Sequence, residues 1–214
     1  FLIFLVSFSV NYYYGSIGVL PIDTFAFFDS ANFINKGYLP IRDYWTSNGF
    51  LVDIFQSLFF KILEVNWYSY LFHSSFINFI FAVLTYKFFI NEGLSKKASL
   101  FYSLSVAILA YPSVGVPFPD HHSLIFSLIS IYFLIFTIKT KSKTYLFITI
   151  LSLAIAFLCK QVPAGFFLIL VSAYLISFSL QKGNKIFLIY TFSYSFLLIL
   201  VFILFLLIAS IGIK

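Results

Sequence analysis

Long apolar runs alternate with short polar connections along most of the chain. The runs hold 16 to 26 residues each and cover residues 1–20, 67–90, 99–117, 122–138, 144–159, 164–180 and 186–211. A transmembrane helix needs about 20 apolar residues, whereas a strand of a membrane barrel needs about 9–11 and alternates in hydrophobicity. The runs are too long for such strands and lack their alternation. The pattern predicts an all-α polytopic membrane protein with about seven transmembrane helices.

Residues 21–66 form the one long stretch without a predicted span. Two parts of it, 24–36 and 51–63, carry apolar residues at helical spacing with polar residues between them. The apolar positions are Phe25, Phe28, Ala31 and Phe33 in the first part, and Ile54, Phe55, Leu58, Phe59 and Ile62 in the second. Between the two parts, Gly37, Pro40 and the Asn48-Gly49 pair are typical turn residues. We expect two amphipathic helices that lie in the membrane interface within a first outer loop.

The composition supports a membrane protein and excludes an ordinary soluble domain. Hydrophobic residues make up 62% of the chain and charged residues 9%, whereas a soluble domain carries about 25% charged residues. The chain has no Met and begins at Phe1 inside an apolar run. We therefore expect residues 1–214 to be one transmembrane domain from a longer protein. The single Cys159 excludes a disulfide within the chain.

Lysine residues mark one side of the predicted membrane domain. The connections around residues 91–97, 139–143 and 181–185 all fall on the same side when every run crosses the membrane. With Lys87, this side holds eight of the 13 Lys and Arg residues: Lys87, Lys96, Lys97, Lys139, Lys141, Lys143, Lys182 and Lys185. The positive-inside rule makes it the cytoplasmic side.

Acidic residues gather on the opposite side. It holds six of the seven acids, namely Asp23, Asp29, Asp43, Asp53, Glu64 and Asp120, and only Glu92 falls inside. Acids contribute little to membrane orientation, so their distribution needs another explanation. A functional outer face is one such explanation.

Asp23 directly follows the first predicted span, in the sequence Pro21-Ile22-Asp23. A carboxylate at the lip of a membrane helix is costly unless it is hydrated or paired, and it is a functional candidate for that reason. A structural alternative is an N-cap for a helix that begins at Thr24. The sequence leaves both interpretations open.

A second candidate site is the predicted outer turn from Pro117 to Ser123. It contains the consecutive residues Asp120, His121 and His122. Asp120 can cap the following helix, but a cap requires neither His. Asp and His can bind a metal or hydrogen-bond a phosphate. Neighbouring side chains diverge on a helix, which favours a ligand role for one His over a joint role.

Two further groups on the outer side can bind anions. Lys160 and Gln161 form a short predicted turn, where Lys160 is either a snorkelling interface residue or a cation for an anionic group. Arg42 and Asp43 are either a surface ion pair or a planar donor pair aimed at phosphate. His73, near the outer end of the second span, is more typical of a satisfied helix residue and is not included in the predicted site.

The order of these features resembles the start of GT-C membrane glycosyltransferases, the superfamily of protein O-mannosyltransferases and lipid A aminoarabinose transferases. The resemblance rests on a first span followed by Pro21-Ile22-Asp23, a helix over 26–35, and the sequence GYLPIRDYW at residues 37–45. In that family an Asp follows the first span, two interfacial helices occupy the first outer loop, and a second acid lies in a later outer loop. Asp23 and Asp120 match these acids. Many members have Asp-Glu where this chain has Asp23-Thr24.

The resemblance implies transfer of a sugar from a polyprenyl-phosphate donor to an extracytoplasmic glycan, lipid or protein acceptor, at the outer face of a bacterial inner membrane. Asp23 would act as general base or would orient the acceptor. Lys160, Arg42 and one of His121 or His122 would neutralise the leaving phosphate. Asp120 would orient the acceptor or help to hold a divalent metal.

Two alternatives make different predictions. A transporter or flippase of lipid-linked glycans should carry ionisable residues at mid-span, where this chain has almost none. A membrane assembly subunit without enzymatic activity should scatter its outer acids instead of directing them into a common cavity.

Overall fold

The computed structural model describes residues 1–19, 21–46, 49–110, 115–181 and 185–211. Nine α-helices and no strand are present in these ranges. The helices are α1 (Leu2–Ile17), α2 (Pro21–Asn35), α3 (Leu51–Leu63), α4 (Trp67–Asn91), α5 (Lys96–Leu109), α6 (Pro119–Thr140), α7 (Lys143–Cys159), α8 (Gln161–Gln181) and α9 (Lys185–Ile211). The all-α class predicted from the apolar pattern is confirmed.

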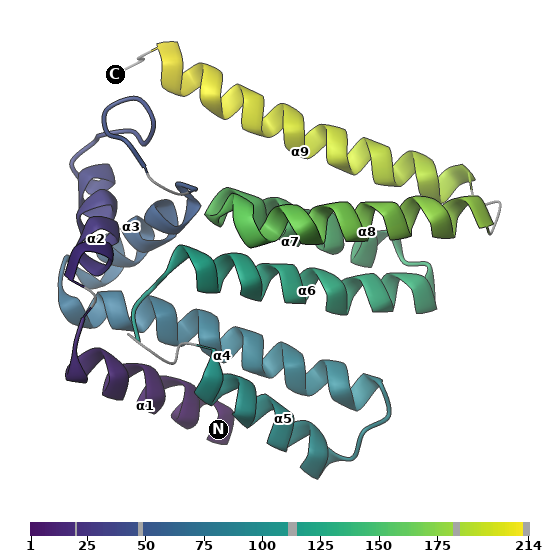
Figure 1. Ribbon diagram of the computed structural model, residues 1–214, viewed down its shortest axis with the longest axis horizontal. Coiled ribbons are helices and arrows are strands. Elements are labelled where there is room, and N and C mark those ends of the chain that lie inside the picture. The colour runs from purple at the N-terminus through teal and green to yellow at the C-terminus, as the bar shows by residue number, and fades with distance from the viewer. Residues whose placement is uncertain (20, 47–48, 111–114, 182–184, 212–214) are drawn as a thin grey trace. The chain divides into compact units, whose positions relative to one another are not determined.

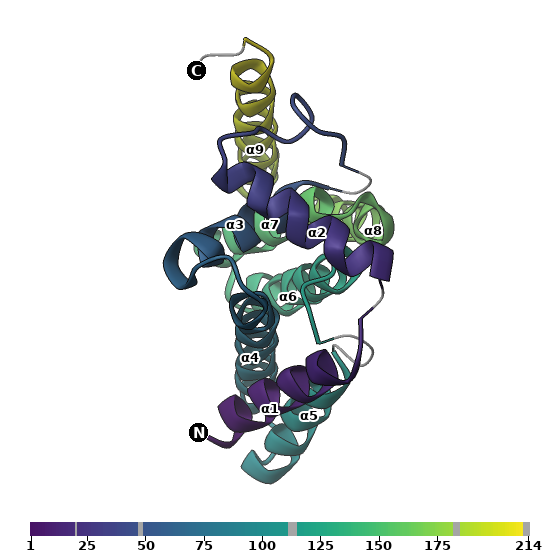
Figure 2. The same ribbon diagram turned by 90° about the vertical axis from the view of Figure 1, so that its left-hand side faces the viewer.

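The chain divides into two compact units, and the division falls within α6. Unit 1 contains Phe1–Pro40 and Phe50–His122, and unit 2 contains Ile41–Gly49 and Ser123–Lys214. In unit 1, α4 packs against α1, α5 and α3, and α2 packs against α3 (Figure 1). The chain bends by 112° between α1 and α2. As a result, α2 lies across the direction of α4, which is seen end-on in Figure 2.

A buried polar network holds α1, α4 and the segment before α6 together. The Asn78 Nδ2 group donates to Asn11 Oδ1 and to the Ala107 carbonyl, both at 2.8 Å. Asn11 Nδ2 donates to the Gly115 carbonyl at 3.3 Å, and Ser74 Oγ donates to the same carbonyl at 2.5 Å. Interhelical hydrogen bonds from small polar side chains are a common means of joining membrane helices. Here they fix Gly115, two residues before Pro117.

Unit 2 consists of the rest of α6 with α7, α8 and α9. Its core is apolar and includes Leu134, Leu146, Ile150, Leu153, Val171, Leu175 and Phe187. The first-loop segment Ile41–Gly49 also belongs to this unit. Gly49 lies so close to the Leu158 and Cys159 carbonyls, at the end of α7, that a Cβ atom would overlap them. This close approach requires glycine at position 49.

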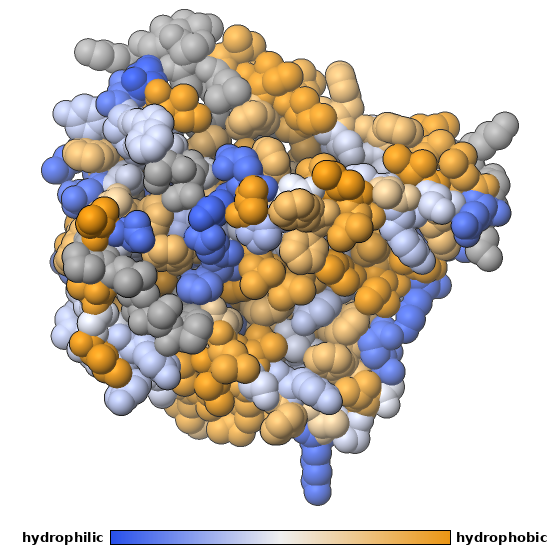
Figure 3. Space-filling view, in the orientation of Figure 1, coloured by the Kyte–Doolittle hydropathy of each residue, from blue (hydrophilic) through white to orange (hydrophobic). Residues whose placement is uncertain are grey.

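The polar and apolar faces of α3 are inverted relative to those of a surface helix in a soluble protein. Asp53 and Gln56 are 3% and 1% exposed, whereas Leu58 and Ile62 are 49% and 78% exposed. Apolar side chains also cover most of the surface over α8 and α9 (Figure 3). A helix that buries its carboxylate and exposes its leucines is stable where its outer face contacts lipid. The inversion therefore supports the predicted membrane setting of the first loop.

The predicted span count of seven is not confirmed by helix length and composition. Within the described ranges, four helices are long and apolar enough to cross a membrane, namely α4, α6, α8 and the Phe187–Leu204 part of α9. The bent pair of α1 and α2 gives a fifth if it is one span. The predicted span at 99–117 is wrong at its C-terminal end, because α5 ends at Leu109. Pro112, Gly115 and Pro117 follow in the sequence and oppose a continuous helix. The part of this prediction at 111–114 lies outside the described residues.

Candidate functional site

The predicted acids Asp23 and Asp120 occupy equivalent positions in their helices. Both α2 and α6 begin at a proline, Pro21 and Pro119, and each carries its acid in the first turn. Proline suits the first helical position because a backbone N–H at that position would have no partner within the helix. The two acids therefore lie inside the helices and not at the N-cap. Each carboxylate lies at the positive end of a helix dipole, where negative charge is favoured.

The hydroxyl group of Tyr70 connects the first turn of α2 with the segment directly before α6. Tyr70, in α4, is fully buried, and its hydroxyl lies 3.1 Å from the Thr24 carbonyl and 3.5 Å from the Pro117 carbonyl. One hydroxyl proton can be donated to either carbonyl or shared between them. Thr24 is the neighbour of Asp23, and Pro117 is three residues before Asp120. The structure thus brings the two predicted acidic segments to the same buried side chain within unit 1.

Aromatic rings reinforce this junction. The rings of Phe27, in α2, and Phe118 meet edge to face with centroids 5.3 Å apart, and Phe28 meets Tyr70 in the same manner at 5.3 Å. Phe27 and Tyr70 belong to one buried cluster with Val116. Edge-to-face pairs of this kind add to the stability from buried area alone. The start of α6 is therefore packed directly against α2.

The inverted face of α3 brings polar side chains to the same region. Gln56 Oε1 lies 2.9 Å from His73 Nδ1, and the His73 ring stacks on Phe59 with centroids 4.7 Å apart. His73 Nε2 lies 3.2 Å from His122 Nε2, and His122 Nδ1 lies 3.0 Å from the Phe118 carbonyl. Three elements, α3, α4 and the start of α6, are thus connected through buried polar atoms.

His121 and His122 have different surroundings, as expected for neighbours on a helix. His122 is fully buried in the pair with His73, whereas His121 is only partly buried and its ring lies 5.8 Å from that of Phe118. A ligand role for one of the two is therefore better assigned to His121. His122 instead stabilises the start of α6 through its contacts with His73 and Phe118.

Sequence reasoning missed His73, Gln56 and the buried Asp53 as members of this region. The sequence favours a hydrogen-bonded helix residue for His73, and the structure shows one, but a partner of this ring is the predicted site residue His122. A usable signal exists in α4, where Tyr70, His73, Ser74 and Asn78 form a polar stripe at helical spacing in an otherwise apolar span. Polar residues inside a span face other protein groups and not lipid. The stripe therefore predicts that this face of α4 packs against other helices of the protein.

Arg42 and Asp43 form an ion pair in unit 2. Arg42 Nε donates to Asp43 Oδ1 at 2.8 Å, and Nη2 donates to Oδ2 at 2.6 Å. The hydrogen bond to Asp43 raises the pKa of the Arg42 guanidinium above its ordinary value. The predicted surface ion pair is thus present. A role in phosphate binding stays a prediction.

Lys160 and Gln161 form the predicted turn of unit 2, between α7 and α8. Lys160 is the C-cap of α7 with an extended backbone, and its carbonyl accepts a hydrogen bond from Ser123 Oγ at 3.0 Å. Gln161 is exposed at the start of α8. Because Gly49 packs on the Leu158 carbonyl, the first-loop segment reaches the same end of α7. Lys160 as a cation for an anionic ligand stays a prediction.

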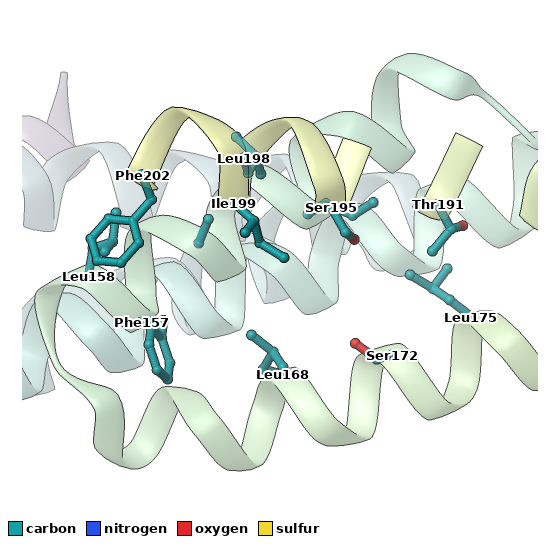
Figure 4. A pocket seen from close by; sticks show the side chains of 12 residues that line it. Phe157, Leu158, Leu168, Ser172, Leu175, Thr191, Ser195, Leu198, Ile199 and Phe202 are labelled. Atoms are coloured by element: carbon teal, nitrogen blue, oxygen red, sulfur yellow. The ribbon is translucent and has the colours of Figure 1, made fainter. Parts of the chain in front are cut away.

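Unit 2 contains a cavity of about 350 Å³ between α7, α8 and α9 (Figure 4). Its lining is apolar except for the hydroxyl-bearing residues Ser172, Thr191 and Ser195. None of the predicted site residues lines it, and none of its lining residues is ionisable. The cavity therefore cannot perform acid–base chemistry through its own side chains.

The described residues contain no group of three or more His, Cys, Asp or Glu residues arranged to hold a metal. Zinc sites in proteins normally use three or four protein ligands. A closed zinc-type site is therefore absent from this part of the chain. Binding of Mg²⁺ by Asp120 together with a donor phosphate stays a prediction, and no reaction step is assigned to a metal. Comparisons with family models, with curated proteins and with solved structures find no match for this chain.

Proposed function

We propose that this protein is a membrane glycosyltransferase of the GT-C type, which moves a sugar from a polyprenyl-phosphate donor to an acceptor on the extracytoplasmic side. The observation that carries the proposal is the junction at Tyr70. Its hydroxyl lies within reach of Thr24 and Pro117, which are close neighbours of the two predicted acids. Acids that were 97 residues apart in the sequence thus belong to one region of unit 1. A scaffold with scattered surface acids does not require this arrangement.

The distribution of lysines supports seven crossings, including the short helices α5 and α7. These helices have 14 and 17 residues, about 21 and 26 Å at 1.5 Å per residue, against a hydrocarbon core of about 30 Å. If α5 and α7 did not cross, Lys96 and Lys141 would lie on opposite sides of the membrane. If both cross, all the lysine-rich connections lie together, as the positive-inside rule favours. Local thinning of the bilayer accommodates short spans at modest cost.

The proposed reaction assigns a step to each acid. The acceptor hydroxyl attacks the anomeric carbon of the sugar, a new C–O bond forms, and the bond from that carbon to the phosphate oxygen breaks. Asp23 accepts the proton from the acceptor hydroxyl, which is the work of a general base. Asp120 orients the acceptor. The polyprenyl phosphate leaves with the bonding electrons, and stabilising its charge requires a nearby donor, for which His121 is the candidate in unit 1.

The proposal is favoured over a transporter because of where the charges lie. Transport sites are built from ionisable residues near the middle of spans. In the four long apolar helices, the described Asp, Glu, Lys and Arg residues lie toward the helix ends: Asp120 and Lys139 are in the terminal turns of α6, and Lys87 is four residues before the end of α4. The polar groups of the candidate site are at one end of their helices. A site at the membrane boundary suits a donor whose phosphate is at the interface and whose tail is in the bilayer.

Replacement of Asp23 with Asn tests the proposal. The exposed Asp23 side chain contributes no packing that Asn would remove, so Asp23→Asn should insert and fold normally. We expect sugar transfer from a polyprenyl-phosphate sugar to fall at least about 100-fold, the scale of a lost general base. Glu64→Gln, which neutralises another exposed acid of the same loop, is the matched control and should retain activity. Full activity of Asp23→Asn would remove Asp23 from the mechanism.

A further inference from the structure

The buried pair of His73 and His122 has no part in the proposed reaction, but its hydrogen bonding constrains the site. Both side chains are fully buried, and their Nε2 atoms face one another at 3.2 Å with ring planes tilted by 58°. Each ring also has an oxygen near Nδ1, from Gln56 for His73 and from Phe118 for His122. The positions of the protons follow from these three contacts.

The Phe118 oxygen fixes the proton position on His122. It is a backbone carbonyl, which can only accept, so His122 must carry its proton on Nδ1. In a neutral ring Nε2 is then an acceptor. If Gln56 also presented its oxygen to His73, the His73 proton would be on Nδ1 as well. Two Nε2 lone pairs would then face one another at 3.2 Å with no proton between them.

The amide of Gln56 offers the solution. Its Nε2 is buried and has no hydrogen-bond partner when Oε1 faces His73. The two amide ends are nearly the same shape, and their assignment follows from the hydrogen-bond network. When the amide is turned, Gln56 Nε2–H donates to His73 Nδ1, His73 Nε2–H donates to His122 Nε2, and His122 Nδ1–H donates to Phe118. Every ring nitrogen in this neutral chain then has a compatible partner.

We propose that His73 is a positioning residue of the candidate site, and that it acts through this directed chain from Gln56 to Phe118. The proposal rests on the proposed function for the site that it positions. His73 is held by the stacked ring of Phe59 and the Gln56 amide, and its Nε2–H fixes the ring of His122. His122 in turn holds the Phe118 carbonyl, which also accepts the His122 backbone N–H at 3.1 Å. The first turn of α6, which carries Asp120 and His121, is thereby tied to α3 and α4.

The tautomers of the two rings provide a test that does not depend on activity. Residues 1–214 contain three His. In ¹⁵N-histidine-labelled protein in detergent, the imidazole signals of His73, His121 and His122 are assigned by the loss of one signal in each single His→Gln variant. We expect neutral rings, with His73 protonated on Nε2 and His122 on Nδ1. The same tautomer in both rings, or a charged ring at neutral pH, would overturn the proposal. So would a shift of both Nε2 signals on addition of Zn²⁺, since two nitrogens on a tetrahedral zinc lie about 3.4 Å apart.

Two substitutions of His73 separate positioning from packing. His73→Gln keeps an amide N–H that can donate to His122, whereas His73→Leu fills the space without a donor. We expect His73→Gln to retain a kcat within about threefold of the natural protein, and His73→Leu to lose at least about tenfold in kcat with little change in donor KM. Equal kcat values in the two variants would show that the ring only fills space. Failure of the natural protein to transfer sugar would overturn the proposed function and the positioning role, while the tautomers would still be read from the spectra.

Discussion

Among the glycines of unit 1, Gly115 should be the one whose replacement lowers the free energy of unfolding most, although it has no side chain. Its φ of +67° is a conformation that L-residues adopt at a cost. A Cβ atom would also overlap the Asn11 carbonyl oxygen of α1 and lie 2.6 Å from the Gly15 nitrogen. Gly115→Ala therefore meets two separate penalties, and both arise from backbone atoms that cannot rotate away.

The size of the effect follows from these contacts. The positive φ costs about 1–2 kcal/mol for alanine. Relief of the overlap requires the segment at Gly115 to move away from α1, and this shift weakens the hydrogen bonds that its carbonyl accepts from Asn11 in α1 and Ser74 in α4. Each such bond contributes about 0.5–1.5 kcal/mol. We expect Gly115→Ala to lower the free energy of unfolding by about 2–5 kcal/mol.

Gly37→Ala is the matched control, because Gly37 also has a positive φ of +90° but no atom within 4 Å of the added Cβ. It should lose only the conformational part, about 1–2 kcal/mol. Equilibrium unfolding in mixed micelles, followed by helix content as SDS increases, gives both values. Equal losses in the two variants would refute the proposed contact between α1 and the segment before α6.

Other changes test unit 2. Lys160→Ala should fold normally, because the hydrogen bond at this position uses the Lys160 backbone carbonyl. If the Lys160 ammonium binds the donor phosphate, the variant should show a donor KM raised, or a kcat lowered, by about tenfold. Unchanged kinetics would leave Lys160 as an interface residue. Gly49→Ala should lower thermal stability because its Cβ overlaps the Leu158 carbonyl, whereas Gly165→Ala, in α8 with open space around it, should raise stability by about 0.5–1 kcal/mol. Similar behaviour of the two alanine variants in a melting experiment would argue against the packing of Gly49 on α7.

The apolar pattern predicted most helices well, because a membrane span is a local property of the chain. The predicted runs at 67–90 and 144–159 correspond to α4 and α7 within one residue at each end. The error at 99–117 arose where proline and glycine interrupt a run that hydrophobicity alone continues. The number of membrane crossings is harder to predict from local sequence, because whether a short helix crosses also depends on the bilayer around it.

The partners within the site could not be predicted in the same way. The sequence marked Asp120, His121 and His122 as unusual, and it marked Asp23 by its place after the first span. The connection between these segments runs through Tyr70 and through the His73–His122 pair, which are contacts between residues 46 and 49 positions apart. Such contacts depend on how helices pack, which a single sequence does not encode in any short motif. The inward direction of Asp53 and Gln56 was similarly hidden, because the pattern of α3 specifies two faces but not which of them meets lipid.

Cross-linking of α2 to the start of α6 tests the central claim most directly. Phe27 contacts Phe118, whereas Phe25, two residues earlier, contacts Trp67 instead. In a Cys159→Ala background, we expect Phe27→Cys with Phe118→Cys to be joined in native membranes by a short bifunctional thiol reagent, and Phe25→Cys with Phe118→Cys to be joined much less. Equal or absent cross-linking in the two pairs would contradict the packing of α2 against the start of α6, on which the proposed common site of Asp23 and Asp120 depends.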